Sequence, residues 1–350
     1  MNPPRADAND YINFMLATPA VYSCLEAGRV QPESANRPAH DAFTRLLYRL
    51  EPDPAALWQE AASQVQLDTG VLVVDDSTLD KPYASKMALV THHWSGKHRA
   101  VVQGINLITL LWSEGERYIP CDYRLYAKAT DGLSKNDHFV ALLTSAKVRG
   151  FAPTYVLFDS WYSSLANLKF IRTLGWQWCA RLKANRQVDP DRTGNRPLAH
   201  CAISAQGTVV HLKGYGMIKV FRIVSPHADT ADTANPAPTA STAPTASARV
   251  EYWATSDMAM DELRRLRLSE DAFAIETYHR GIKQFCGVEQ GQMRLARAQR
   301  NHIGLALRAF LRLERYCYVN GISWFEAKHA IVRSAVTAYL ANPLYALATA

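Results

Sequence analysis

The stretch of sequence that decides the fold is Gly70-Val71-Leu72-Val73-Val74-Asp75-Asp76-Ser77-Thr78. Its four consecutive apolar residues, three of them valine, predict a strand that is buried on both faces. The strand is expected to end at the two aspartates. Adjacent carboxylates at the end of a strand repel each other unless a cation or hydrogen bonds stabilise them. The stretch therefore predicts an α/β sheet with candidate metal-binding acids at its edge.

A second apolar run, Tyr155-Val156-Leu157-Phe158, also ends in an acid, Asp159, and a helical pattern from Ser163 to Leu174 follows. Ligands of open α/β sheets bind at the carboxyl ends of the strands. A single aspartate at such a position is more often a cap or turn residue. The functional interpretation of Asp159 therefore depends on the other acids.

A third acid lies in the run Ile275-Glu276-Thr277-Tyr278-His279-Arg280-Gly281-Ile282-Lys283. The run predicts the first turns of a helix, with Glu276 near its start. Glu276, His279, Arg280 and Lys283 are spaced i, i+3, i+4 and i+7, so they share one helix face. A solvated face with an i,i+4 ion pair would show the same pattern. Together with the two strand-end aspartates, however, Glu276 gives the three carboxylates of a metal site.

In order and context these three stretches resemble the DDE transposases of bacterial insertion sequences, whose catalytic domain is ribonuclease H-like. The resemblance runs from about Val71 to Arg315, most of the chain. Around the last acid, the family carries an aromatic residue, one further residue, Ile-Glu, six residues and a lysine. The residues that fit this spacing are Phe273, Ile275, Glu276 and Lys283. The resemblance implies an α/β fold with a ribonuclease H-like mixed sheet flanked by helices and a β-rich insertion before the glutamate.

Two positions depart from the family pattern. Many relatives carry an arginine four residues before the glutamate and a tyrosine seven before it, where this chain has Ala272 and Ser269. In relatives these residues help to handle the DNA end, so the route of end processing, including any hairpin step, stays open.

The first acid is ambiguous, because strand alternation points Asp75 and Asp76 to opposite faces. In relatives the catalytic aspartate is typically followed by two small hydroxyl residues, and Asp76-Ser77-Thr78 meets that pattern. We therefore favour Asp76, and expect Asp75 to bind a loop amide or to stay solvated.

The resemblance implies a specific chemistry. Asp76 or Asp75, with Asp159 and Glu276, would hold two Mg²⁺ or Mn²⁺ ions roughly 4 Å apart. The reaction would be hydrolysis at the transposon end, followed by attack of the freed 3′-hydroxyl on target DNA. The expected partners are double-stranded DNA, as terminal inverted repeats and target, and a second copy of the chain on paired ends. The residues expected to contact DNA are Lys283, Arg280, His279 and Arg294.

Composition agrees with a polyanionic partner, since the net charge is +7, from 39 basic and 32 acidic residues. The run His92-His93-Trp94-Ser95-Gly96-Lys97-His98-Arg99 is expected in a loop or hairpin, where phosphate contact or solvent exposure is favoured over metal binding. The six cysteines form no Cys-x-x-Cys pair. No signal peptide or membrane-spanning run is visible, so we expect a cytoplasmic, nucleoid-associated protein of bacteria.

The chain is expected to have four regions. The first is a helical segment that either binds DNA or packs as a cap on the core, and the second is the first part of the catalytic core. The third is a β-rich insertion with a disordered loop rich in Ala, Thr, Pro and Ser, and the fourth is the helical remainder of the core with the tail. Their ranges are 1–66, 67–184, 185–258 with the loop at 229–248, and 259–350.

Three other functions can be weighed. Asp76-Ser77-Thr78-Leu79 faintly resembles a haloacid dehalogenase-type phosphatase, but that chemistry needs an aspartate where Val74 stands. A ribonuclease H-like nuclease of repair or recombination would share the acids, although the insertion and the Glu-x6-Lys spacing favour a transposase. A non-catalytic DNA-binding derivative would not be expected to retain all the acids.

Overall fold

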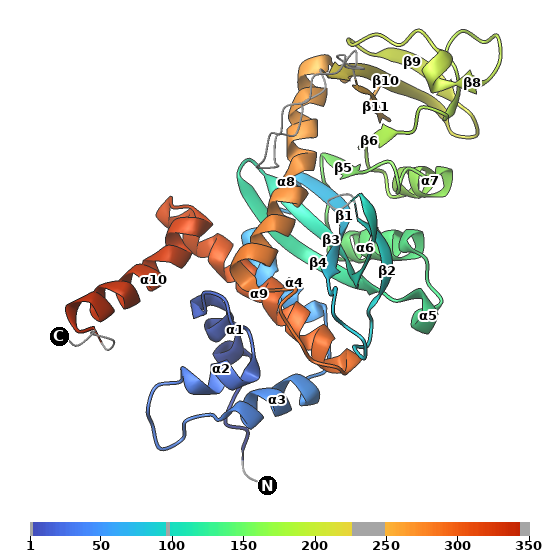
Figure 1. Cartoon of the computed structure of the whole chain (residues 1–350). Coiled ribbons are helices and arrows are strands. Elements are labelled where there is room, and N and C mark those ends of the chain that lie inside the picture. The colour runs from blue at the N-terminus through green and yellow to red at the C-terminus, as the bar shows by residue number, and fades with distance from the viewer. Residues whose placement is uncertain (1–2, 96–98, 226–248, 344–350) are drawn as a thin grey trace, which may run out of the picture. The chain divides into compact units, whose positions relative to one another are not determined.

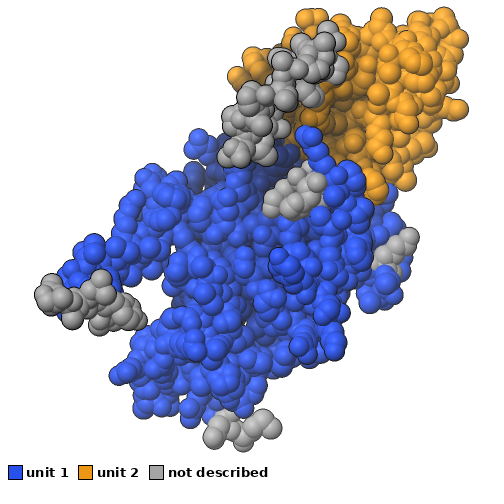
Figure 2. All heavy atoms as spheres, viewed as in Figure 1, with its two compact units in different colours: residues 1–151, 273–350 blue, residues 152–272 orange. Residues whose placement is uncertain are grey.

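The computed structural model describes residues 3–95, 99–225 and 249–343. The chain forms two compact units: unit 1 comprises residues 1–151 and 273–350, and unit 2 comprises residues 152–272 (Figure 2). The division falls within the long helix α8 (Glu262–Cys286). The predicted loop at 229–248 lies outside the described residues, and the predicted domain boundaries stay a prediction.

Unit 1 contains an antiparallel sheet of four strands, β1 (Val71–Asp80), β2 (Thr91–Ser95), β3 (Ala100–Glu114) and β4 (Arg117–Tyr126). Strand β1 pairs with one edge of β3 along its whole length, from Val71 opposite Ser113 to Asp80 opposite Gly104. Strands β2 and β4 pair with the other edge of β3. The expectation that the first strand ends at Asp75 and Asp76 is therefore wrong, because β3 supplies backbone partners for four further residues.

The two faces of this sheet are covered by different helices (Figure 1). Helix α6 (Lys135–Val148) lies on the face of Tyr126, whose ring packs edge-on against His138 of α6. Helix α9 (Ala296–Asn320) lies on the face of Tyr123, where a Cβ at Gly304 would come within 2.6 Å of the tyrosine hydroxyl. The register places Asp76 on the α6 face and Asp75 on the α9 face.

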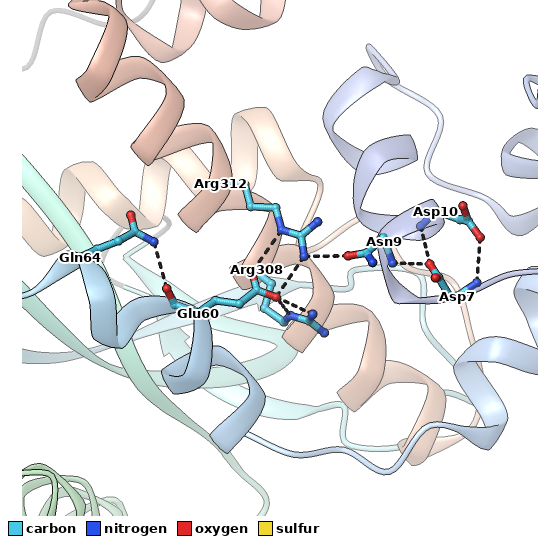
Figure 3. A network of polar contacts seen from close by, with 7 residues as sticks. All are labelled: Asp7, Asn9, Asp10, Glu60, Gln64, Arg308 and Arg312. Carbon is cyan, nitrogen blue, oxygen red and sulfur yellow. Dashed lines mark hydrogen bonds and ion pairs between the residues drawn. The ribbon is translucent and has the colours of Figure 1, made fainter.

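Helices α1 (Ala8–Ala17), α3 (His40–Arg49) and α4 (Ala55–Ala61) pack against α9. Glu60 of α4 receives hydrogen bonds from Arg308 and Arg312 of α9, and Arg312 also binds Asn9 of α1, 2.9 Å away (Figure 3). The N-terminal helical segment thus packs on the core, which is one of its two expected roles. The other role, DNA binding, stays a prediction. The other described helices of unit 1 are α2 (Cys24–Arg29), η1 (Ala62–Gln64), α5 (Lys128–Asp131) and α10 (Trp324–Ala341).

Unit 2 is mostly β-structure. Its strands lie in the order β5-β6-β11-β10-β9-β7-β8, of which β5 and β6 are parallel and the others antiparallel. The elements are β5 (Tyr155–Phe158), α7 (Leu165–Thr173), β6 (Trp178–Leu182), β7 (Gln187–Asp189), β8 (Arg196–Pro197), η2 (Leu198–His200), β9 (Thr208–Leu212), β10 (Gly216–Ser225) and β11 (Arg249–Thr255). The expected fold class, a mixed α/β protein with helices flanking its strands, is confirmed. No helix in the described ranges is long and apolar enough to cross a membrane.

Helix α8 begins well before the position expected from the sequence. The Asp261 carboxylate accepts a hydrogen bond from the Arg264 amide, 2.6 Å away, and so caps the helix start. The helix ends where Gly287 adopts a positive φ of 60°. Glu276 therefore lies in the second half of a 25-residue helix, and the prediction that it stands near the helix start is wrong.

Candidate active site

Asp76 lies in the middle of β1, and side chains of β3 and α6 donate hydrogen bonds to its carboxylate. The Asn106 amide of β3 donates to Asp76 Oδ2 over 2.6 Å, and the Lys135 ammonium donates to the same oxygen over 2.7 Å. The Asp76 and Lys135 side chains are each 18% exposed. Lys135 is the first residue of α6, whose start is fixed by a reciprocal capping box between Ser134 and Asp137. The carboxylate of Asp76 is thus held by one neutral and one cationic donor.

Two buried polar atoms near this carboxylate have no hydrogen-bond partner among the described residues. One is Oδ1 of Asn106, a residue that is fully buried. The other is Nε2 of His279, on α8. Buried polar atoms are nearly always satisfied in native proteins, if not by protein then by water or an ion.

Helix α8 brings Glu276 and its neighbours to unit 1. Glu276 and Arg280 are exposed, whereas His279 is 7% exposed. Burial lowers the pKa of His279 to about 3, with a further contribution from Lys283, and the charge of Asp76 opposes the shift. His279 is thus a neutral, buried side chain close enough to Asp76 to interact with its charge. Its burial suits a positioning role better than the expected contact with DNA.

Lys283, one turn after His279, ties α8 to β1. Its ammonium donates to the backbone carbonyl of Thr78 over 2.7 Å and lies 3.4 Å from the Glu289 carboxylate. Thr78 is two residues beyond Asp76 on the same strand. Lys283 therefore helps to fix the helix that carries Glu276 against the strand that carries Asp76.

The segment after α8 is held to the end of β1 by a second lysine. Buried Lys81 donates to the carbonyls of Glu289 and Gly291 over 2.6 and 2.5 Å. Burial lowers the pKa of Lys81 to about 8, although the Glu289 carboxylate opposes the shift. The side chain of Arg294 is exposed in the same segment, and its carbonyl accepts from the Ala88 amide at 2.9 Å. Arg294 is thus available at the surface for a phosphate contact.

Asp159 follows β5 in unit 2. Its Oδ1 accepts hydrogen bonds from the amides of Trp161, at 2.8 Å, and Tyr162, at 3.4 Å. This is an Asx-type turn, in which a side-chain oxygen replaces a backbone acceptor. Helix α7 then begins after Ser164, whose hydroxyl accepts from the Asn167 amide. The Asp159 carboxylate is thus held at the strand end by backbone amides of the residues that follow it.

Sequence reasoning missed Asn106 and Lys135. Asn106 is a polar residue inside the apolar run Gly104-Ile105-Asn106-Leu107-Ile108, and a buried amide needs a partner. Lys135 places a cation in the first turn of a helix, where the macrodipole disfavours it. Both anomalies are readable in the sequence.

No group of three or more His, Cys, Asp or Glu residues is arranged to hold a metal within residues 3–95, 99–225 and 249–343.

Comparison with known proteins gives the family. The model of the DDE superfamily endonuclease family matches residues 4–200, more than half of the chain. The chain belongs to this family, and the match includes Asp75, Asp76 and Asp159 but ends before Glu276. The assignment of Glu276 as the third acid thus stays a prediction.

Two solved structures are similar in part. A cryo-EM structure of the piggyBac transposase synaptic complex with hairpin DNA has 12% sequence identity and a TM-score of 0.49, covering 98% of this chain and 73% of the other. The Drosophila P element transposase strand transfer complex has 12% identity and a TM-score of 0.26, covering 49% of this chain and 36% of the other. No curated protein matches the chain.

Proposed function

We propose that this protein is a DNA transposase that cleaves transposon ends and transfers the 3′-hydroxyl end into target DNA. The observation that carries the proposal is the setting of Asp76 in a member of the DDE endonuclease family. Its carboxylate is mostly buried, is bound by Lys135, and interacts electrostatically with His279. His279 lies one turn after Glu276 on the same helix.

In this proposal Asp76, Asp159 and Glu276 hold two Mg²⁺ or Mn²⁺ ions, with Asp75 as the alternative first acid. The donor set fits, because carboxylate oxygens are the ligands that these hard cations prefer. Lys135 already places a cation 2.7 Å from Asp76 Oδ2, and Oδ1 of Asn106, which no described residue hydrogen-bonds, suits an ordered water. When bound, the metal ions activate the attacking oxygen and stabilise the departing one.

The chain's own side chains have distinct roles in the proposal. Exposed Arg280 and Arg294 bind DNA phosphates, because the planar guanidinium can donate two hydrogen bonds to one phosphate. Lys283 and His279 hold α8 in place beside β1, and Lys283 contacts a phosphate near the cleaved end only if it leaves Thr78. The proposal includes a homodimer working on paired terminal repeats, and action at the nucleoid in the cytoplasm of a bacterium.

The test is metal-dependent cleavage of DNA that carries the ends flanking the gene. Wild-type protein should cleave with Mg²⁺ or Mn²⁺, and Glu276→Ala should not. Glu270→Ala is the matched control, since Glu270 is another exposed acid of α8, and it should cleave like wild type.

Two results would contradict the proposal in different ways. Cleavage of the ends without joining to target DNA would indicate a nuclease of repair or recombination. DNA binding without cleavage by the wild-type protein would indicate a non-catalytic derivative, for which Ala272 and Ser269 are the first positions to restore.

A further inference from the structure

Lys135 stands where simple electrostatics disfavours a lysine. It is the first residue of α6, and the N-terminal end of a helix carries a partial positive charge. Its side chain is nevertheless only 18% exposed, and its ammonium lies 2.7 Å from Asp76 Oδ2 and 5.7 Å from the centre of the Tyr126 ring. A long, strongly hydrated side chain is buried this far only when a partner compensates for the lost water. Asp76 is such a partner for Lys135.

We propose that Lys135 is the resident counter-ion of Asp76, and that it competes with the divalent cation for this carboxylate. The proposal rests on the proposed function, in which Asp76 is a metal ligand. It adds a residue that the three-acid pattern does not contain, and a reason for its position at the start of α6.

The hydrogen bonds of Asp76 give the physical basis. A carboxylate oxygen offers two lone-pair directions, and Oδ2 already accepts from Asn106 and from Lys135. A metal ion that binds Oδ2 must displace one donor, and the lysine on its flexible stem is the one that can withdraw, since Asn106 is fixed in β3. A metal ion at the other oxygen would still be repelled by an ammonium a few ångströms away.

In the absence of metal the same contact has a stabilising role. Asp75 and Asp76 are adjacent carboxylates in a strand that is largely buried. Lys135 places a positive charge 2.7 Å from Asp76 Oδ2, and this ion pair offsets the repulsion between the two carboxylates. In this proposal the Lys135–Asp76 ion pair stabilises the metal-free fold and weakens metal binding.

The experiment is a titration of the metal-free, full-length protein with Mn²⁺ in the absence of DNA, with free Mn²⁺ measured by electron paramagnetic resonance. Lys135→Met should bind Mn²⁺ about tenfold more tightly than wild type, because one repelling charge beside the ligand is removed. Lys135→Gln, which keeps a donor without the charge, should show the same gain. Lys135→Arg should behave like wild type.

Two controls separate the possible failures. Lys147→Met removes an exposed charge from the other end of α6 and should leave Mn²⁺ binding unchanged. Asp76→Asn should weaken it strongly, and if it does not, Asp76 is not a metal ligand and the site in the proposed function is wrong. If Asp76→Asn weakens binding but Lys135→Met and Lys135→Gln bind as wild type or more weakly, the counter-ion proposal alone is overturned.

Discussion

Strand β1 of unit 1 and strand β5 of unit 2 carry the same sequence pattern, an apolar run followed by an acid, yet the two acids are held in different ways. Asp76 lies inside a strand and is bound by the side chains of Asn106 and Lys135. Asp159 lies after its strand and is bound by backbone amides of the residues that follow. One acid is placed by tertiary structure and the other by a local turn.

The difference follows from what each strand has beside it. Strand β1 stays paired beyond its acids because the 15-residue β3 runs alongside it as far as Asp80. Strand β5 has only four residues, and the Asx-type turn at Asp159 directs the chain into α7. Loss of the Asp76 side chain should therefore disturb the buried tertiary partners Asn106 and Lys135, whereas loss of the Asp159 side chain should disturb the local turn at Trp161 and Tyr162.

The largest expected effect is on DNA cleavage, where the two acids should behave alike. Asp76→Asn and Asp159→Asn should each lower the cleavage rate by about a thousandfold or more, because each removes a charged ligand needed in the transition state. Asp75→Asn should lower it by less than about tenfold. The measurement is cleavage of end-bearing DNA under single-turnover conditions. An inactive Asp75→Asn beside an active Asp76→Asn would reverse the choice of first acid.

The second expected effect is on stability, where the two acids should differ. Asp76→Ala leaves the fully buried Asn106 amide without its acceptor and Lys135 without its counter-ion, so it should lower the free energy of unfolding by about 1–3 kcal/mol. Asp159→Ala loses the turn bonds donated by the Trp161 and Tyr162 amides and should cost about 1 kcal/mol or less. Asp159→Asn keeps an oxygen acceptor and should cost little.

Urea denaturation of the metal-free variants measures these differences. Equal losses for Asp76→Ala and Asp159→Ala would show that the partners of Asp76 contribute nothing beyond a local turn. Such a result would remove the distinction between the two acids.

The contrast between the two acids also shows which structural features can be predicted from local sequence patterns. Local patterns predicted the apolar part of β1 and the strand at Tyr155, because a short apolar run is set by a few neighbouring residues. They failed at the end of β1 and at the start of α8. The end of β1 depends on β3, which begins twenty residues later, and the start of α8 depends on a cap at Asp261, fourteen residues before Ile275.

The site divides in the same way. Residue types and spacing select Asp76, Asp159 and Glu276 as candidates. The partners of Asp76, in contrast, come from β3 and α6, and no local pattern states that Asn106 and Lys135 reach the same oxygen. Nor does spacing show that His279 is buried while Arg280, the next residue, is exposed. The spacing predicts which residues of α8 share a face, but it does not predict which of them neighbouring elements bury.

The smallest expected effect concerns Glu60, an acid bound by cations like Asp76 but remote from the proposed chemistry. Burial alone would raise the pKa of Glu60, but hydrogen bonds from Arg312 and Arg308 outweigh it and hold the pKa below its usual value (Figure 3). A lowered pKa in the folded state means that this contribution to stability is fully present above the unfolded value of 4.5. It is lost as the pH falls through the lower folded value.

Glu60→Gln should therefore lower the free energy of unfolding at pH 7 by less than about 1 kcal/mol, and the difference from wild type should shrink below pH 4.5. DNA cleavage should be unchanged. Glu51→Gln is the matched control, since Glu51 pairs with Arg297 but is 75% exposed, and its effect should be smaller still because exposed pairs are well solvated. If Glu60→Gln lost cleavage while keeping its stability, Glu60 would have a role in the reaction. The division into a structural acid, Glu60, and a catalytic acid, Asp76, would then be wrong.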